Sequence, residues 1–178
     1  MNIIVPENVG FCFGVRRAVD LTIENIKKGK KVFSPGNIVH NDDVMGWLRE
    51  LGLSNKDGDT YVVKAHGLPP EEIRKISDGY NVVDATCPIV LNLFKLAVSL
   101  HEQGYEVYVY GMENHDEMIA LKGHLPQARI FRNACKVSGK KVAFLSQTTM
   151  NYNSYVDFVH DCLILSEIEE TLVVNPSR

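Results

Sequence analysis

The sequence lacks most of the features that mark membrane, secreted or nucleic-acid-binding proteins. No apolar run approaches the ~20 residues that a membrane-spanning helix needs. The first residues, MNIIVPENVG, lack the basic start and the apolar core of a secretory signal. The 178 residues carry a formal net charge of −3, which gives no electrostatic reason to expect binding to nucleic acid. We therefore expect a cytoplasmic protein that binds neither membranes nor nucleic acid.

Closely spaced cysteines and nucleotide-binding signatures are also missing. The four cysteines are far apart, with no CxxC pair and no dense framework of the kind found in small secreted proteins. In a reducing cytosol such cysteines are more often buried, catalytic or bound to metal than joined in disulfides. No GxGxxG follows a predicted strand and no GxxxxGK[ST] occurs, which argues against a flavodoxin-like nucleotide-binding domain.

Short apolar runs alternate with helical patterns along almost the whole chain. This alternation predicts parallel sheets with crossover helices, and continuous apolar runs are typical of strands buried on both faces. Strands are predicted at residues 2–7, 30–39, 60–67, 80–87, 105–112, 128–133, 140–148 and 171–176. Helices are predicted at residues 15–29, 42–53, 69–79, 89–104, 116–125 and 151–168.

The length of the chain allows one sizeable domain or two small ones. No Gly/Ser-rich linker divides it, but the alternation of strand and helix restarts near Cys87 and Pro88. We therefore expect an α/β fold of two small parallel-sheet units with crossover helices, at residues 1–88 and 89–178.

Chemically interesting residues follow the predicted strands. Ligands of parallel α/β sheets bind beyond the carboxyl ends of the strands. If the two units face one another, the residues at these ends converge on one cleft. They are Cys12, His40, Asn41, His66, Gly67, Cys87, Pro88, Asn114, His115, Glu117, Gln147, Thr148 and Thr149.

Two of the cysteines stand at such strand ends. A lone cysteine is usually a small buried hydrophobe. In GFCFGV, however, glycines flank Cys12 and allow a close approach of the backbone to a ligand, and the helix that follows favours a thiolate. Cys87, in DATCP, precedes a helix in the same way. Two thiolates suggest a shared metal or iron–sulfur cluster, although two are too few for a structural zinc site. Cys162 is expected in the core, and the role of Cys135 stays open.

The histidines and the acid at strand ends have two readings each. Singly, His40, His66 and His115 would be ordinary structural residues. Together, three imidazoles and a helix N-terminus can hold a phosphate. Glu117 could compensate a helix dipole, or it could donate a proton in a cleft that contains a metal and hydroxyl groups. Thr148 could cap a helix or bind a substrate alcohol. His101 and His160 are expected at the surface and His124 at a helix end.

The motifs GFCFGV, IVHN, KAHG, DATCP, NHDE and SQTT, in this order, resemble the 4-hydroxy-3-methylbut-2-enyl diphosphate reductase family of isoprenoid biosynthesis by the methylerythritol phosphate route. The resemblance implies three α/β domains around a [4Fe-4S] cluster held by three cysteines, of which Cys12 and Cys87 match two. It implies reductive removal of the substrate hydroxyl as water, which yields isopentenyl and dimethylallyl diphosphate. Electrons would come from reduced ferredoxin or flavodoxin.

The resemblance also assigns roles to individual residues. His40, His66 and His115 match the histidines of the diphosphate pocket. Glu117 matches the acid that delivers protons, and Thr148 matches the threonine that binds the substrate alcohol.

The chain departs from the family pattern in two ways. Asp116 stands where the family usually has proline, which adds a negative charge near the phosphates. The third cysteine of the family comes in a third domain, after a segment like TLVVNPSR, and this chain ends at Arg178. The leading hypothesis is therefore a truncated reductase with the first two of three domains, which self-associates through the face that the third domain would cover.

Two alternatives remain. The short chain could be a working enzyme in which Cys135, or a cysteine of a second copy, supplies the third thiolate. It could also be a non-catalytic binding or assembly module that retains the reductase fold.

Overall fold

The computed structural model describes residues 10–175, and the predicted strand at residues 2–7 lies outside this range. Every other predicted element is present with its predicted type, although the strands are shorter than the apolar runs. The elements in chain order are α1 (Phe13–Lys27), β1 (Val32–Phe33), α2 (Asp42–Glu50), β2 (Thr60–Val63), α3 (Pro70–Ser77), β3 (Asn81–Asp84), α4 (Pro88–Glu102), β4 (Glu106–Tyr110), α5 (Asp116–His124), β5 (Arg129–Phe131), β6 (Lys141–Ser146), α6 (Tyr152–Ile164) and β7 (Glu170–Val173).

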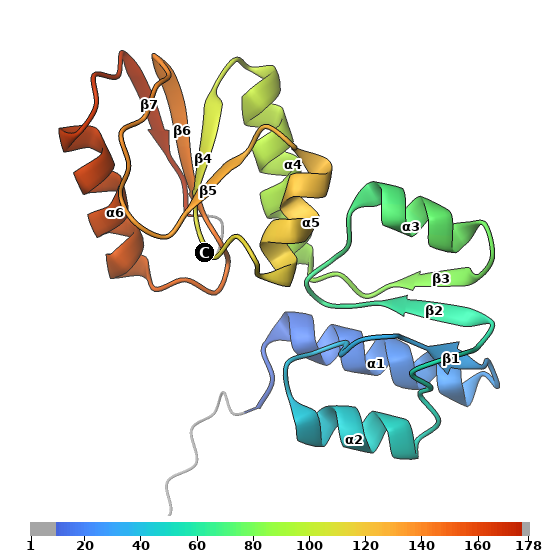
Figure 1. Cartoon of the computed structure of the whole chain (residues 1–178). Helices are drawn as coiled ribbons and strands as arrows, with labels where there is room; N and C mark the ends of the chain where they lie inside the picture. The colour runs from blue at the N-terminus through green and yellow to red at the C-terminus, as the bar shows by residue number, and fades with distance from the viewer. Residues whose placement is uncertain (1–9, 176–178) are drawn as a thin grey trace, which may run out of the picture. The chain divides into compact units, whose positions relative to one another are not determined.

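The strands form two parallel sheets (Figure 1). The first has the order β1-β2-β3 and the second the order β5-β4-β6-β7, and all their pairings are parallel. This confirms the predicted α/β class, because helices connect the successive parallel strands. No helix in the described part of the chain is long and apolar enough to cross a membrane.

The chain divides into two compact units by its internal contacts. Unit 1 comprises residues 1–65 and 81–87, and unit 2 comprises residues 66–80 and 88–178. The segment with α3 thus groups with unit 2, although it connects two strands of the first sheet. We predicted that two folding domains meet between residues 88 and 89, and this stays a prediction.

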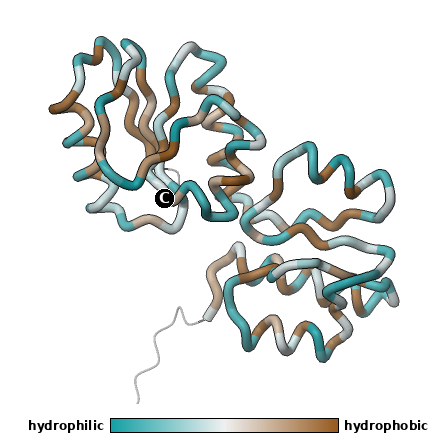
Figure 2. Tube along the Cα trace, viewed as in Figure 1, coloured by the Kyte–Doolittle hydropathy of each residue, from teal (hydrophilic) through white to brown (hydrophobic). Residues whose placement is uncertain are grey.

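Each unit has its own apolar core. In unit 1, α1 and α2 pack on the first sheet through residues such as Ala18, Leu48 and Val62, all fully buried. In unit 2, side chains of β4 and β6 pack against α6, with Phe144 and Cys162 fully buried. Figure 2 shows hydrophobic residues along these strands and polar residues in many of the turns.

The prediction that strands are buried on both faces is confirmed for the middle of the second sheet. It is wrong for β3 and β7. All residues of β4 and β6 after the first are buried. In β7 all four residues are exposed, and in β3 none is buried. Both β3 and β7 stand last in the order of their sheets, where less protein covers a strand. An apolar run alone does not distinguish a central strand from an outer one.

Helix ends follow the local sequence closely. The Asn41 side chain accepts a hydrogen bond from the Val44 N–H (2.9 Å) at the start of α2, and Asn151 accepts one from the Ser154 N–H (3.2 Å) at the start of α6. After α1 and α4, Gly29 and Gly104 adopt positive φ angles of 78° and 88°. This conformation suits glycine and ends the helix, as the sequence predicted.

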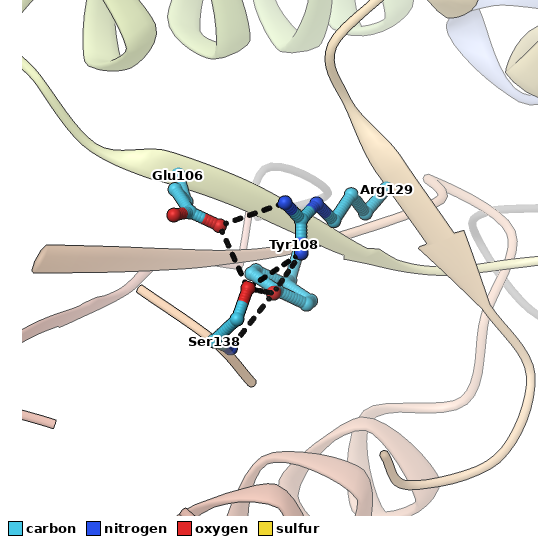
Figure 3. A network of polar contacts seen from close by, with 4 residues as sticks. All are labelled: Glu106, Tyr108, Arg129 and Ser138. Atoms are coloured by element: carbon cyan, nitrogen blue, oxygen red, sulfur yellow. Dashed lines mark hydrogen bonds and ion pairs between the residues drawn. The ribbon is translucent and has the colours of Figure 1, made fainter. Parts of the chain in front are cut away.

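A polar network fastens the segment between β5 and β6 to the second sheet (Figure 3). The Arg129 guanidinium donates to the hydroxyls of Tyr108 and Ser138, both at 2.8 Å, and forms an ion pair with Glu106 at 3.2 Å. The Ser138 N–H donates to the Tyr108 hydroxyl at 3.2 Å. The network holds residues 132–140 in place, and this segment contains Cys135.

Candidate functional site

Unit 1 brings Cys87 to the start of α1, which directly follows Cys12. Cys12 is the exposed residue at the N-cap of α1, and its carbonyl accepts the hydrogen bond of the Arg16 N–H at 3.0 Å. Gly14 is buried in the first turn of α1. A Cβ atom at this position would lie only 2.5 Å from the Cys87 Sγ. The two cysteines predicted as ligands therefore lie close to the same helix turn.

Unit 2 places two of the predicted histidines side by side. The rings of His66 and His115 meet edge to face, with centroids 5.3 Å apart and an interplanar angle of 80°. His115 is also the N-cap of α5, where its Nδ1 accepts a hydrogen bond from the Glu117 N–H at 3.2 Å. Because Nδ1 acts as an acceptor, the proton of the neutral ring is assigned to Nε2. In this tautomer Nε2–H is a hydrogen-bond donor.

Asp116 occupies the first position of α5, between His115 and Glu117. The helix dipole stabilises a carboxylate at such a position. The departure from the family's usual proline therefore leaves the helix start intact, with His115 as its cap and Asp116 in its first turn.

Glu117 is fully buried, which a residue that only compensated a helix dipole would not need to be. Its Oε1 accepts a hydrogen bond from the Thr148 N–H at 2.8 Å, and its Oε2 accepts one from the Thr148 hydroxyl at 2.7 Å. Burial raises the pKa of the Glu117 carboxyl, and the two hydrogen bonds from Thr148 oppose part of this rise. The result is a buried carboxyl that takes up a proton more readily than an exposed one.

Gln147, at the end of β6, is a site residue whose role sequence reasoning missed. Its side chain is fully buried; Oε1 accepts from the Met112 N–H at 3.0 Å, and Nε2 donates to the Thr149 hydroxyl at 2.7 Å. It thereby joins the loop after β4 to the loop after β6, next to Thr148. The only signal in the sequence was its place directly after a buried strand, in SQTT.

The other histidines are described within their own units. His40 is exposed in unit 1, directly before the cap of α2. His101 and His160 are exposed, as predicted, and His124 ends α5, where its ring stacks on Phe94 with centroids 4.6 Å apart. Within unit 1 the structure brings Cys87 to the helix start that Cys12 precedes, and within unit 2 it brings together His66, His115, Glu117 and Thr148.

The other two cysteines form a pair inside unit 2. Cys162 is fully buried in α6, as predicted. Its Sγ accepts a hydrogen bond from the Cys135 N–H at 3.4 Å. Burial, together with the neighbouring Cys162 sulfur, raises the pKa of the Cys135 thiol to about 11.

Comparison with known proteins agrees with the motifs. The sequence matches the LytB protein family over residues 3–171. It is 43% identical to the 4-hydroxy-3-methylbut-2-enyl diphosphate reductase of Thermotoga petrophila, over 98% of this chain and 65% of that protein. The corresponding reductase of Aquifex aeolicus is 32% identical, with the same two coverages. The chain thus spans about 65% of the length of these curated relatives.

Two solved structures are similar over most of the chain. A structure of (E)-4-hydroxy-3-methyl-but-2-enyl diphosphate reductase matches 98% of this chain and 67% of its own, with a TM-score of 0.84 and 30% identity. The corresponding reductase of Plasmodium falciparum matches 94% of this chain and 57% of its own, with a TM-score of 0.82 and 25% identity. With the family match covering nearly the whole sequence, the chain belongs to the LytB protein family.

Proposed function

We propose that this chain carries two of the units of a 4-hydroxy-3-methylbut-2-enyl diphosphate reductase, an oxidoreductase that removes the substrate hydroxyl and forms isopentenyl and dimethylallyl diphosphate. The names of the curated relatives support the reaction. The observation that carries it in this structure is the hydrogen-bonded pair of the buried Glu117 and the half-buried Thr148. Protonation of a leaving alcohol requires a group that holds a proton within hydrogen-bond distance of the atom that receives it, and a carboxyl hydrogen-bonded to a hydroxyl can provide this.

Glu117 and Thr148 would move the proton. When Glu117 is protonated, its Oε2–H can donate to the Thr148 hydroxyl oxygen, from which it is separated by 2.7 Å. The threonine hydroxyl can then donate its own proton to the substrate alcohol. The loss of the alcohol as water consumes this proton, and Glu117 is left as a carboxylate that Thr148 stabilises through two hydrogen bonds.

The histidines would bind the diphosphate. In unit 2, the Nε2–H of His115 is assigned as a donor, and the ring of His66 lies beside it. Imidazoles suit a phosphate because they donate hydrogen bonds and can carry a positive charge. His40 of unit 1 is proposed for the same role by its match to the family motif.

Cys12 and Cys87 are proposed as ligands of a [4Fe-4S] cluster. They fit such a group, since Cys12 is exposed and Gly14 leaves room for the Cys87 thiol near the same helix turn. When bound, the cluster would supply electrons and a Lewis-acidic iron. Cys135 is a poor third ligand, because burial raises the pKa of its thiol to about 11 and iron binds the thiolate. A third ligand would come from the part of the protein that the relatives possess beyond this match, or from a second copy.

The remaining partners follow from the reaction and from the surface. Reduced ferredoxin or flavodoxin would supply the electrons, in the cytoplasm, where the four free thiols of the chain are stable. We also propose that the chain self-associates. Exposed apolar side chains on α6 and β7, such as Ile164 and Val173, support this. A single elution volume in size-exclusion chromatography over a wide range of concentrations would contradict self-association.

Anaerobic reconstitution with iron and sulfide tests the proposed function. We expect a longer protein that carries the remaining third to retain iron and to reduce the hydroxylated diphosphate with a reduced dye as electron donor. Glu117→Gln should then abolish turnover without loss of iron, because glutamine cannot deliver a proton. Binding of the diphosphate without iron and without turnover would instead favour the non-catalytic module.

A further inference from the structure

The segment that carries Cys87, residues 84–87 at the end of β3, is held in one conformation by its own side chains. The Asp84 carboxylate accepts hydrogen bonds from the Thr86 N–H at 2.9 Å and from the Thr86 hydroxyl at 2.5 Å. The Cys87 N–H donates to the Ala65 carbonyl at 2.9 Å. Ala85 and Thr86 are buried. The backbone position of Cys87 is therefore set within unit 1.

Arg17 of α1 holds the same segment from a neighbouring helix. Its Nη1 donates to the Thr86 carbonyl at 3.2 Å and to the Asp84 carbonyl at 3.3 Å, and its Nη2 also donates to the Asp84 carbonyl at 3.3 Å. A guanidinium can serve two carbonyls at once because its donors form a planar fork, whereas a lysine ammonium is a single point charge. Arg17 thus ties α1 to the backbone on both sides of Ala85, directly before Cys87.

Gly14 leaves the space that the Cys87 side chain occupies. A Cβ at position 14 would lie 2.5 Å from the Cys87 Sγ and 2.9 Å from its Cβ, which are distances that non-bonded atoms do not tolerate. Glycine is an unfavourable residue inside a helix. Its presence in the first turn of α1 is explained by this close approach.

We propose that Gly14 and Arg17 are positioning residues for the Cys87 thiol. Arg17 holds the backbone that carries Cys87, and Gly14 admits its sulfur against the first turn of the helix that Cys12 precedes. The Cys87 thiol is thus held against the first turn of the helix that Cys12 precedes before any metal binds, and a preorganised ligand loses less conformational freedom when it binds a metal centre. The use of this pair rests on the proposed function, in which both thiolates bind one iron–sulfur cluster, but the positioning itself does not.

Alkylation of the metal-free chain by iodoacetamide, under anaerobic reducing conditions, tests the proposal. Each of the four cysteines falls in a different tryptic peptide, so mass spectrometry follows their rates separately. Gly14→Ala and Arg17→Ala should each raise the alkylation rate of Cys87 about tenfold, because the segment opens locally. The rates of Cys135 and Cys162 in unit 2 should stay unchanged, whereas general destabilisation would raise them as well.

Two matched controls are present in unit 1. Gly46, in α2, has open space where a Cβ would be added, so Gly46→Ala should leave the Cys87 rate unchanged. Arg16→Ala removes an exposed arginine beside Arg17 and should also leave it unchanged. Cys87 rates within twofold of wild type in both Gly14→Ala and Arg17→Ala would overturn the proposal.

A double-mutant cycle keeps the proposal testable if Arg17→Ala fails to fold. Gly14→Ala should lower the melting temperature of the chain, and it should lower it less in a Cys87→Ala background, because the clash with Sγ is then gone. Equal losses in the two backgrounds would contradict the contact. Arg17→Lys keeps the charge but loses the fork, so it should raise the Cys87 rate in a folded chain.

The outcome separates the positioning from the proposed function. If Gly14→Ala and Arg17→Ala raise the Cys87 rate as expected, but a longer protein that carries the remaining third retains no iron after reconstitution, the positioning stands and the cluster assignment fails. If iron is retained while Gly14→Ala and Arg17→Ala change neither the Cys87 rate nor the iron content, the cluster assignment stands and the positioning fails.

Discussion

The two pairs of cysteines in this chain differ in their surroundings more than in their sequence contexts. In unit 1, Cys12 is exposed and Cys87 lies against a glycine in the first turn of a helix. In unit 2, Cys162 is buried in the core, and burial raises the pKa of its neighbour Cys135 to about 11. The first pair is placed to react or to bind, and the second is placed to pack.

Burial alone does not separate the two roles, as Glu117 demonstrates. Its carboxyl is as deeply buried as the Cys162 thiol, yet both its oxygens are hydrogen-bonded to one threonine at the end of β6. What distinguishes Glu117 is its place in the first turn of a helix together with hydrogen-bond donors that suit a carboxylate. Cys162 lies within a helix and lacks such a place.

The largest effect is expected when one thiol of each pair is removed in turn. Cys87→Ser should abolish iron retention after anaerobic reconstitution, because serine supplies no thiolate, whereas Cys135→Ser should retain the wild-type iron content. Bound iron and sulfide per chain are the measurement. Loss of iron in Cys135→Ser, with Cys87→Ser unaffected, would reverse the assignment of the two pairs.

The next effect is the low reactivity of Cys135. With its pKa raised to about 11 from an ordinary value of 9.0, the folded thiol should be alkylated roughly 100-fold more slowly near pH 8 than the same thiol in urea. The rate should rise with pH until the pH passes this pKa. Since the raised pKa favours the protonated folded state, stability is also lost as the pH rises from 9 toward 11. A folded Cys135 that reacts as fast as the unfolded one would contradict the burial effect.

A smaller effect is expected on stability. Cys162→Ser places a hydroxyl in the fully buried site of the Cys162 sulfur and should lower the free energy of unfolding by about 1–3 kcal/mol. Cys12→Ser changes an exposed side chain and should alter it by less than about 0.5 kcal/mol. Urea unfolding of the two variants, followed by circular dichroism, measures the difference. Similar losses in both would remove the distinction between a packing and a binding cysteine.

The smallest effect concerns the pH dependence of Glu117. Its raised pKa favours the protonated folded state, so its contribution to stability is present below the ordinary carboxyl pKa and is lost as the pH rises through the raised value. Glu117→Gln does not titrate, so its stability relative to wild type should increase as the pH rises above the ordinary carboxyl range. Glu113→Gln, at an exposed glutamate nearby, should show no such trend. A pH-independent difference for Glu117→Gln would contradict the raised pKa.

Much of the fold could be predicted because its signals are local. Apolar runs, capping asparagines and the glycines at positions 29 and 104 act within a few residues, so the type and order of the described elements followed from the sequence. The same local signals failed for β3 and β7, whose exposure depends on their place in the sheet and not on their composition.

The candidate site residues could be named from the sequence, but their contacts could not be. The residues at strand ends, and the order of their motifs, were visible in the sequence, as was the resemblance to the family that the comparisons later showed. The role of Gln147 was not visible, because a glutamine after a strand has no pattern that distinguishes a buried bridge from an exposed side chain.

By itself, the sequence determined the α/β class, the family, and which cysteines, histidines and acid are candidates for the site. The tertiary structure alone decided that Glu117 is buried against Thr148, that Cys135 pairs with Cys162, and that Gly14 and Arg17 hold Cys87 in place. The physical reason is the range of the interactions. Periodicity and capping act between neighbours in the chain, whereas burial, pKa shifts and close approaches arise between residues that only folding brings together.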